Sequence, residues 1–155
     1  MSPDTVGTQR RIASNIEALE NFLDMLDQLD FAGAVPELGE AFPPRLPCHN
    51  VQISVRPEIL LKTKGKTGAL IGALKIHFPK TNALNDASAG YVSAVLQDWC
   101  AVHMQHQGAP SGPHCYVIDV GSKAVYPGVK STTKRMSDIQ AACDTISALW
   151  PTITK

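Results

Sequence analysis

Basic and hydroxyl side chains gather between residues 126 and 135, YPGVKSTTKR, in a pattern that suggests anion chemistry. Lys130, Ser131, Thr132, Lys134 and Arg135 lie just before a predicted helix, whose first backbone amides are unpaired and whose dipole favours an anion. The run is not a phosphate-binding P-loop, because a valine separates its glycine from its first lysine. It predicts either an anion-binding loop or an ordinary solvated loop that caps the helix.

A second candidate group is formed by Lys75, His77 and Asp119. Lys75 and His77 share one face of a predicted strand, and Asp119 interrupts the apolar run CYVIDV. If the three side chains meet in one cleft, they could perform acid–base chemistry. An aspartate at such a place more often caps the following turn. No triad or carboxylate pair accompanies these residues, so the sequence favours a protein that is not an enzyme.

Histidines and cysteines are present, but their spacing predicts no metal and no cofactor. His103 and His106 could meet on a helix, whereas His114 and Cys115 are adjacent strand residues that point to opposite faces. The four cysteines form no CxxC pair, which indicates reduced thiols. The chain shows no signal-peptide pattern and no apolar run of the ~20 residues that a membrane span needs. We therefore expect a soluble, cytoplasmic protein with no membrane partner.

Composition predicts one domain that carries little charge. The 155 residues are 44% hydrophobic, which suffices for a core, and we expect a single domain over residues 1–155. Charged residues make up 18% of the chain, below the ~25% of a typical domain, so part of the neutral surface is expected to be covered by a second copy. The net charge of zero argues against a surface built for nucleic acid.

The charge is unevenly distributed along the chain. Residues 1–60 hold four basic and nine acidic side chains, whereas residues 61–155 hold ten basic and five acidic ones. The simpler interpretation is that the acidic first part packs on the basic remainder. The alternative leaves the basic part free for an anionic partner.

Hydrophobic periodicity predicts three helices and two hairpins. The expected helices cover residues 14–30, 84–108 and about 137–150, with Ser14 and Glu17 as a capping box and Asn85 or Asp86 as the second cap. The first expected hairpin joins residues 51–61 to 69–78, where Gly72 leaves room for a close neighbour, and the second joins 115–120 to 124–127. Residues 1–13 are predicted to be flexible, and residues 31–50 to form a proline-rich connection.

This order, α-ββ-α-ββ-α, predicts an α+β fold with an antiparallel sheet of four or five strands and helices mainly on one face. It resembles the element order of the secretion-chaperone fold, whose members dimerise and hold an extended client segment. The resemblance implies a non-enzymatic, chaperone- or adaptor-like binding protein, homodimeric through a sheet face or its first helix, with a protein client.

Two alternatives remain open. One is a phosphate- or nucleic-acid-binding protein that uses the basic loop 130–135; nucleic acid is less favoured because no aromatic residues are interleaved with the lysines. The other is an enzyme with a site near Lys75, His77 and Asp119.

Overall fold

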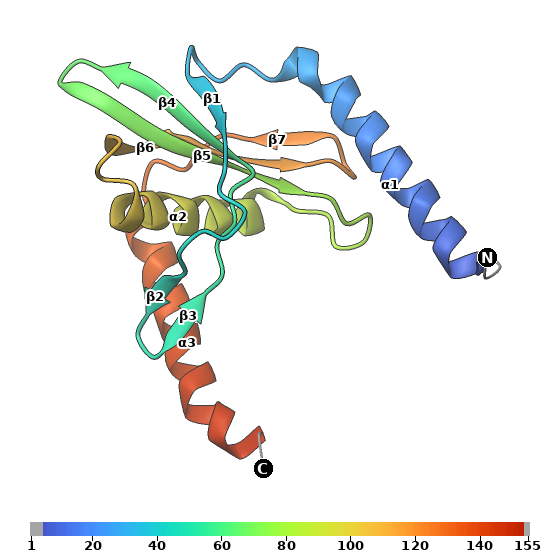
Figure 1. Ribbon diagram of the computed structural model, residues 1–155. Helices are drawn as coiled ribbons and strands as arrows, with labels where there is room; N and C mark the ends of the chain where they lie inside the picture. Colours follow the sequence, from blue (N-terminus) through green and yellow to red (C-terminus); the bar gives the residue numbers. More distant parts are fainter. Residues whose placement is uncertain (1–4, 154–155) are drawn as a thin grey trace.

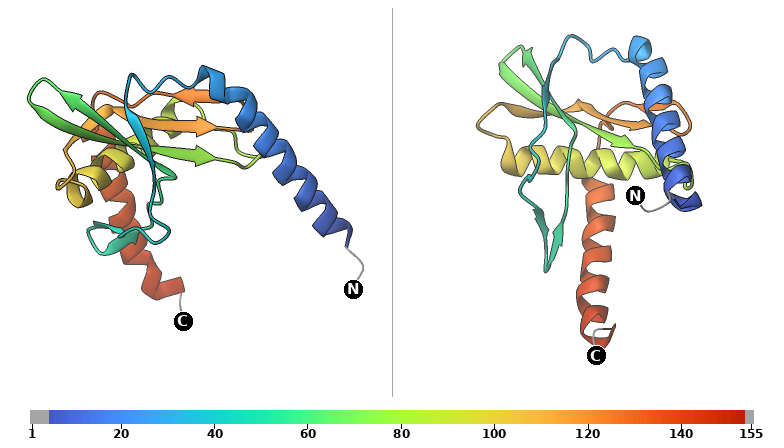
Figure 2. Two further views of the ribbon diagram at one scale, coloured as in Figure 1. Left: turned by 45° about the horizontal axis from the view of Figure 1, so that its top comes forward. Right: turned by 45° about the vertical axis from the view of Figure 1, so that its right-hand side comes forward.

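A computed structural model describes residues 5–153 and shows a central sheet from which two long helices project (Figures 1 and 2). The helices are α1 (Val6–Met25), continued by a 3-10 turn, η1 (Leu26–Gln28), then α2 (Asp86–His103) and α3 (Thr133–Ile153). The strands are β1 (Val35–Leu38), β2 (Leu46–Cys48), β3 (Val51–Ile53), β4 (Ile59–Gly65), β5 (Gly68–His77), β6 (Ala109–Asp119) and β7 (Ala124–Tyr126).

The main sheet is mixed, so the predicted α+β class is confirmed but the purely antiparallel sheet is wrong. Its strand order is β1-β4-β5-β6-β7, and β5 and β6 are parallel while the other neighbours are antiparallel. The reason is α2, which carries the chain back along the sheet so that β6 runs in the same direction as β5. Strands β2 and β3 form a separate two-stranded hairpin.

Helices cover both faces of the sheet, contrary to the expectation that they gather mainly on one. On one face α2 packs over Ile71, Ala73, Cys115 and Val117, and α3 then packs against α2 and β3. On the other face the second half of α1 covers a smaller apolar cluster: Met25, Leu74, Ile76, Ile118 and Val120. Neither sheet face is therefore left open as a broad contact surface.

The element boundaries differ from the predictions mainly at the chain's first third. Helix α1 begins at Val6, so it includes residues 6–13, which we expected to be flexible; residues 1–4 lie outside the described part. Its N-cap is Thr5 rather than Ser14, and no side chain caps it. The connection over residues 31–50 contains β1 and β2, which the sequence did not predict.

Two local predictions are confirmed. Asn85 caps α2, accepting a 2.9 Å hydrogen bond from the backbone amide of Ser88, while the Ser88 hydroxyl accepts one from the Asn85 amide. Gly72 does leave room for a close neighbour, because a Cβ atom there would lie 2.2 Å from the carbonyl oxygen of His114. This contact lies where the register of β5 and β6 shifts between Ile71 and Ala73.

Ion pairs join the acidic first part of the chain to the basic remainder, as the simpler interpretation of the charges predicted. Glu17 and Asp24 of α1 pair with Lys80 and Lys123, at loops beside the sheet. Glu37 of β1 pairs with Lys62 of β4 at 2.7 Å. Each exposed pair contributes about 0–1 kcal/mol, so they orient α1 more than they hold it. No helix within residues 5–153 combines the length and apolar character that crossing a bilayer requires.

Candidate functional site

Helix α1 carries two distinct apolar faces. The first packs on the sheet through Ala18, Phe22 and Met25. The second, which we call the α1 seam, consists of Ile12, Ile16, Leu19 and Leu23 of α1 and Leu26 at the start of η1, which are 50%, 51%, 57%, 62% and 45% exposed. This face is only partly covered within the described chain, where Leu19 borders a hollow that Phe78 and Pro79 also line.

The spacing within the α1 seam is that of a coiled coil. Its five members follow one another at intervals of four, three, four and three residues, which places them alternately at the d and a positions of a heptad repeat. A helix that only covers a sheet needs one apolar stripe with a period near 3.6. A second stripe in strict heptad spacing is typical of a surface that packs against another helix.

Charge is graded along α1. Arg10 and Arg11 lie near its first turn, and Glu20, Asp24 and Asp27 lie in its second half and the turn that follows. Asp24 is engaged with Lys123, whereas Arg10, Arg11, Glu20 and Asp27 are exposed and form no ion pair within residues 5–153. The two ends of the seam therefore carry opposite charge.

A second exposed apolar surface lies at the end of α3, which extends away from the sheet in Figure 2. Ile146, Leu149 and Ile153 are 48%, 52% and 69% exposed. Beside them a shallow hollow lies between α3 and the β2–β3 hairpin, lined by Val51 and Trp150 among others. We call Ile146, Leu149 and Ile153 the α3 tip.

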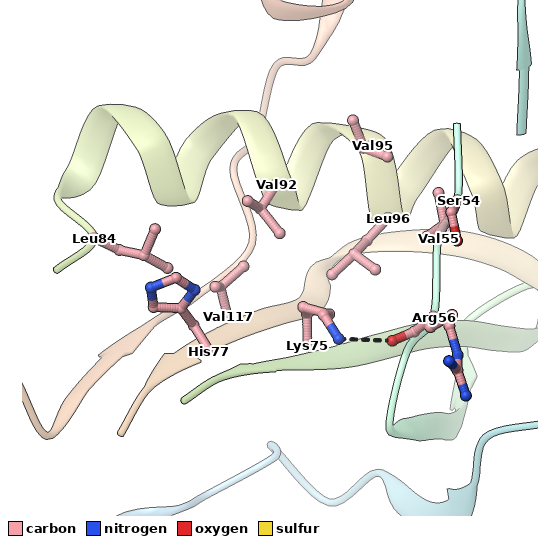
Figure 3. Close-up of a pocket in the computed structure, with 10 residues that line it drawn as sticks. All are labelled: Ser54, Val55, Arg56, Lys75, His77, Leu84, Val92, Val95, Leu96 and Val117. Atoms are coloured by element: carbon pink, nitrogen blue, oxygen red, sulfur yellow. Dashed lines mark hydrogen bonds between the residues drawn. The ribbon is translucent and has the colours of Figure 1, made fainter. Parts of the chain in front are cut away.

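A cavity of about 240 Å³ lies between α2 and the sheet and includes two residues of the predicted sheet-face site. Figure 3 shows Lys75 and His77 of β5 beneath the α2 side chains Val92 and Leu96. The cavity arises because the β4–β5 pairing ends at Ile59 and Leu74, beyond which the chain leaves the sheet. Its lining is mostly apolar, and Lys75 and His77 contribute polar groups from β5.

The structure places Asp119 differently from its predicted companions. Its side chain is fully buried and accepts a 2.7 Å hydrogen bond from the backbone amide of Leu84 and a 3.4 Å one from that of Ser122. Asp119 is therefore a capping group, the alternative that the sequence had offered. His77 bonds the carbonyl of Asn82 at 3.2 Å through Nε2. Of the three predicted residues, only Lys75 and His77 share the cavity.

Sequence reasoning missed Glu58, the ion-pair partner of Lys75. The Lys75 ammonium donates to the Glu58 carboxylate and, at 3.0 Å, to the carbonyl of Arg56. The other carboxylate oxygen accepts a 2.8 Å bond from the amide of Ile76. Glu58 thus extends the pairing with β5 just ahead of the start of β4 at Ile59, and the charges of Glu58 and Lys75 neutralise each other. The contact between Glu58 and Lys75 depends on how the segment before β4 runs beside β5, and no local sequence pattern indicates that course.

Helix α3 begins at Thr133, earlier than predicted, so Lys134 and Arg135 lie in its first turn and only residues 130–132 form a loop ahead of it. The charges of this segment are partly occupied. Lys134 pairs with Asp138 at 3.4 Å, and Arg135 donates to the Ser131 carbonyl at 3.3 Å. The Arg135 guanidinium also lies against Gly90 of α2, within 3 Å of where a Cβ would be. Arg135 thus connects α3 to α2, and Lys130 forms no ion pair within residues 5–153.

Thiols and imidazoles lie in structural rather than metal-binding arrangements. The four cysteines are buried and unbridged, and Cys48 of β2 has Cys143 of α3 as a neighbour. Burial first, and then this neighbour, raises the pKa of Cys48 to about 11. Within residues 5–153, no three His, Cys, Asp or Glu side chains gather so as to hold a metal ion.

Comparison with known proteins gives no relative: no family model, no curated protein sequence and no solved structure matches this chain.

Proposed function

We propose that this chain is a small non-enzymatic binding protein, of adaptor- or chaperone-like type, that works as a homodimer formed through α1. The observation that carries the proposal is the α1 seam, which offers five large aliphatic side chains at coiled-coil spacing to solvent. Soluble monomers rarely expose a continuous apolar patch of this kind without using it. The low charge content of the chain supports the same proposal.

The role in binding, beyond dimer formation, rests on the α3 tip. It is separate from the α1 seam, as α1 and α3 project from different sides of the molecule in Figure 1, so that a dimer held by α1 keeps both copies of the α3 tip exposed. A protein client that lays an apolar segment against α3 would be bound twice by such a dimer, which increases the avidity of binding.

Light scattering of the purified protein tests the proposal. The wild-type chain is expected at twice its mass of 16.7 kDa, and Leu19→Lys, which places a charge at the middle of the seam, at the monomer mass. Ile146→Lys on the α3 tip is the matched control, because Ile146 is also about half exposed, at 48%, and should remain dimeric. Circular dichroism establishes that both variants are folded.

A wild-type chain that stays monomeric at every protein concentration measured, up to several hundred micromolar, would overturn the proposal. So would a Leu19→Lys protein that stays dimeric, since the seam would then not be the contact.

A further inference from the structure

We infer that the partner of the α1 seam is the seam of a second copy, running antiparallel, with the two Leu19 side chains facing each other across the two-fold axis. This inference rests on the proposed function and adds the identity of the occupant, its direction and its register.

Charge decides the direction. In a parallel pair, the ends that carry Arg10 and Arg11 would lie at the same end of the dimer, and the acidic ends would lie together at the other. An antiparallel pair instead brings each arginine end to the end that carries Asp27, while Glu20 lies beside the axis. None of these four residues has an ion-pair partner within its own described chain, so all are free to respond to a second copy. The helix dipoles also oppose one another favourably in this arrangement.

The spacing of the seam decides the register. The five side chains are nearly symmetric about Leu19: Ile12 and Leu26 each lie seven residues from it, and Ile16 and Leu23 lie three and four residues from it. Antiparallel pairing about that residue places Ile12 opposite Leu26 of the partner and brings Ile16 within one residue of the position opposite Leu23. Every large side chain of the seam then has an apolar counterpart, which an isologous two-fold contact requires.

Magnitudes indicate how tight the pair is. Full burial of a leucine or isoleucine side chain contributes about 1.5–3 kcal/mol, so ten half-exposed side chains contribute on the order of 10 kcal/mol. Association costs an estimated ~4–15 kcal/mol in lost freedom and ordering. The net gain is therefore about 6 kcal/mol at most, so the seam alone supports a weak dimer, no tighter than about tens of micromolar. The charged ends decide between the two directions rather than provide the affinity.

Disulfide trapping tests the direction and register, using three variants in the full chain under a thiol–disulfide redox buffer. Leu19→Cys lies on the proposed axis and also faces itself in a parallel pair, so it should form a covalent dimer in either case. Ile12→Cys alone faces itself only in a parallel pair and should stay monomeric on a non-reducing gel. Ile12→Cys combined with Leu26→Cys should form covalent dimers, because the two positions face each other across the antiparallel pair.

The outcomes separate the inference from the proposed function. A covalent dimer of Ile12→Cys alone, with none gained from the double variant, would overturn the antiparallel inference and leave self-association standing. No covalent dimer from Leu19→Cys would overturn the register, and light scattering of the wild-type chain shows separately whether self-association stands. The wild-type chain is the blank, since its four cysteines are buried.

Discussion

The buried carboxylate of Asp119 accepts a hydrogen bond from the backbone amide of Leu84 across 2.7 Å. Asp119 ends β6, and Leu84 immediately precedes the cap of α2, Asn85. This bond therefore connects the end of β6 to the start of α2. The two elements belong to the β5–α2–β6 crossover, which makes β5 and β6 parallel.

Replacing Asp119 by alanine is expected to destabilise the protein by about 1–3 kcal/mol, because the partly buried backbone amide of Leu84 loses its acceptor. Asp119→Asn is the matched control, since its side-chain oxygen can still accept the bond. Urea denaturation gives the difference in free energy of unfolding. Equal losses in the two variants would show that the carboxylate charge, not the hydrogen bond, matters.

Gly72→Ala is expected to cost at least about 1–3 kcal/mol, because its methyl group would overlap the backbone of the adjacent strand β6, 2.2 Å from the His114 carbonyl oxygen. The control is Gly7→Ala in α1, where the nearest atom to a new Cβ is the Thr5 hydroxyl at 3.9 Å. That change should be neutral or stabilise the helix by roughly 0.5–1 kcal/mol. Thermal unfolding of both variants measures this, and a Gly72→Ala protein as stable as wild type would contradict the close strand approach.

Alkaline pH should destabilise the protein partly through Cys48. The thiol keeps its proton up to a pKa of about 11 when folded but ionises near 9.0 when unfolded, so the unfolded state binds fewer protons as the pH rises. Stability is therefore full below pH 9.0 and falls between there and about 11. Cys48→Ala is expected to be less stable at neutral pH but to lose less over this window. Urea midpoints measured across the window give both slopes, and identical slopes would mean that Cys48 does not titrate as described.

Local signals in the sequence predicted the helices and the cap of α2 well, because an asparagine followed by a serine at capping distance acts through nearest neighbours alone. The direction of β6 was missed for the opposite reason. Alternation identifies a strand, but the path of α2 decides which way the next strand runs. The contacts of Asp119 and Glu58 also depend on how distant segments come together. The sequence therefore offered capping only as one of two roles for Asp119, and it did not predict the role of Glu58.

The candidate contact surface shows the same limit. Periodicity predicted the first helix, but only the packing of Phe22 and Met25 on the sheet distinguishes the face that contacts the sheet from the more exposed α1 seam. The expectation of an open sheet face failed because α1 and α2 lie on opposite sides of the sheet.

The first two turns of α1 reach beyond the sheet, and the helix is packed on its own domain only from about Ala18 onward (Figure 2). Short helical segments without tertiary support are marginal in water. In a lone subunit this overhang should fray and exchange its amide hydrogens rapidly, and assembly should order it. The first two turns of α1 would then be stably folded only in the dimer, so the helix content of this end should rise with protein concentration.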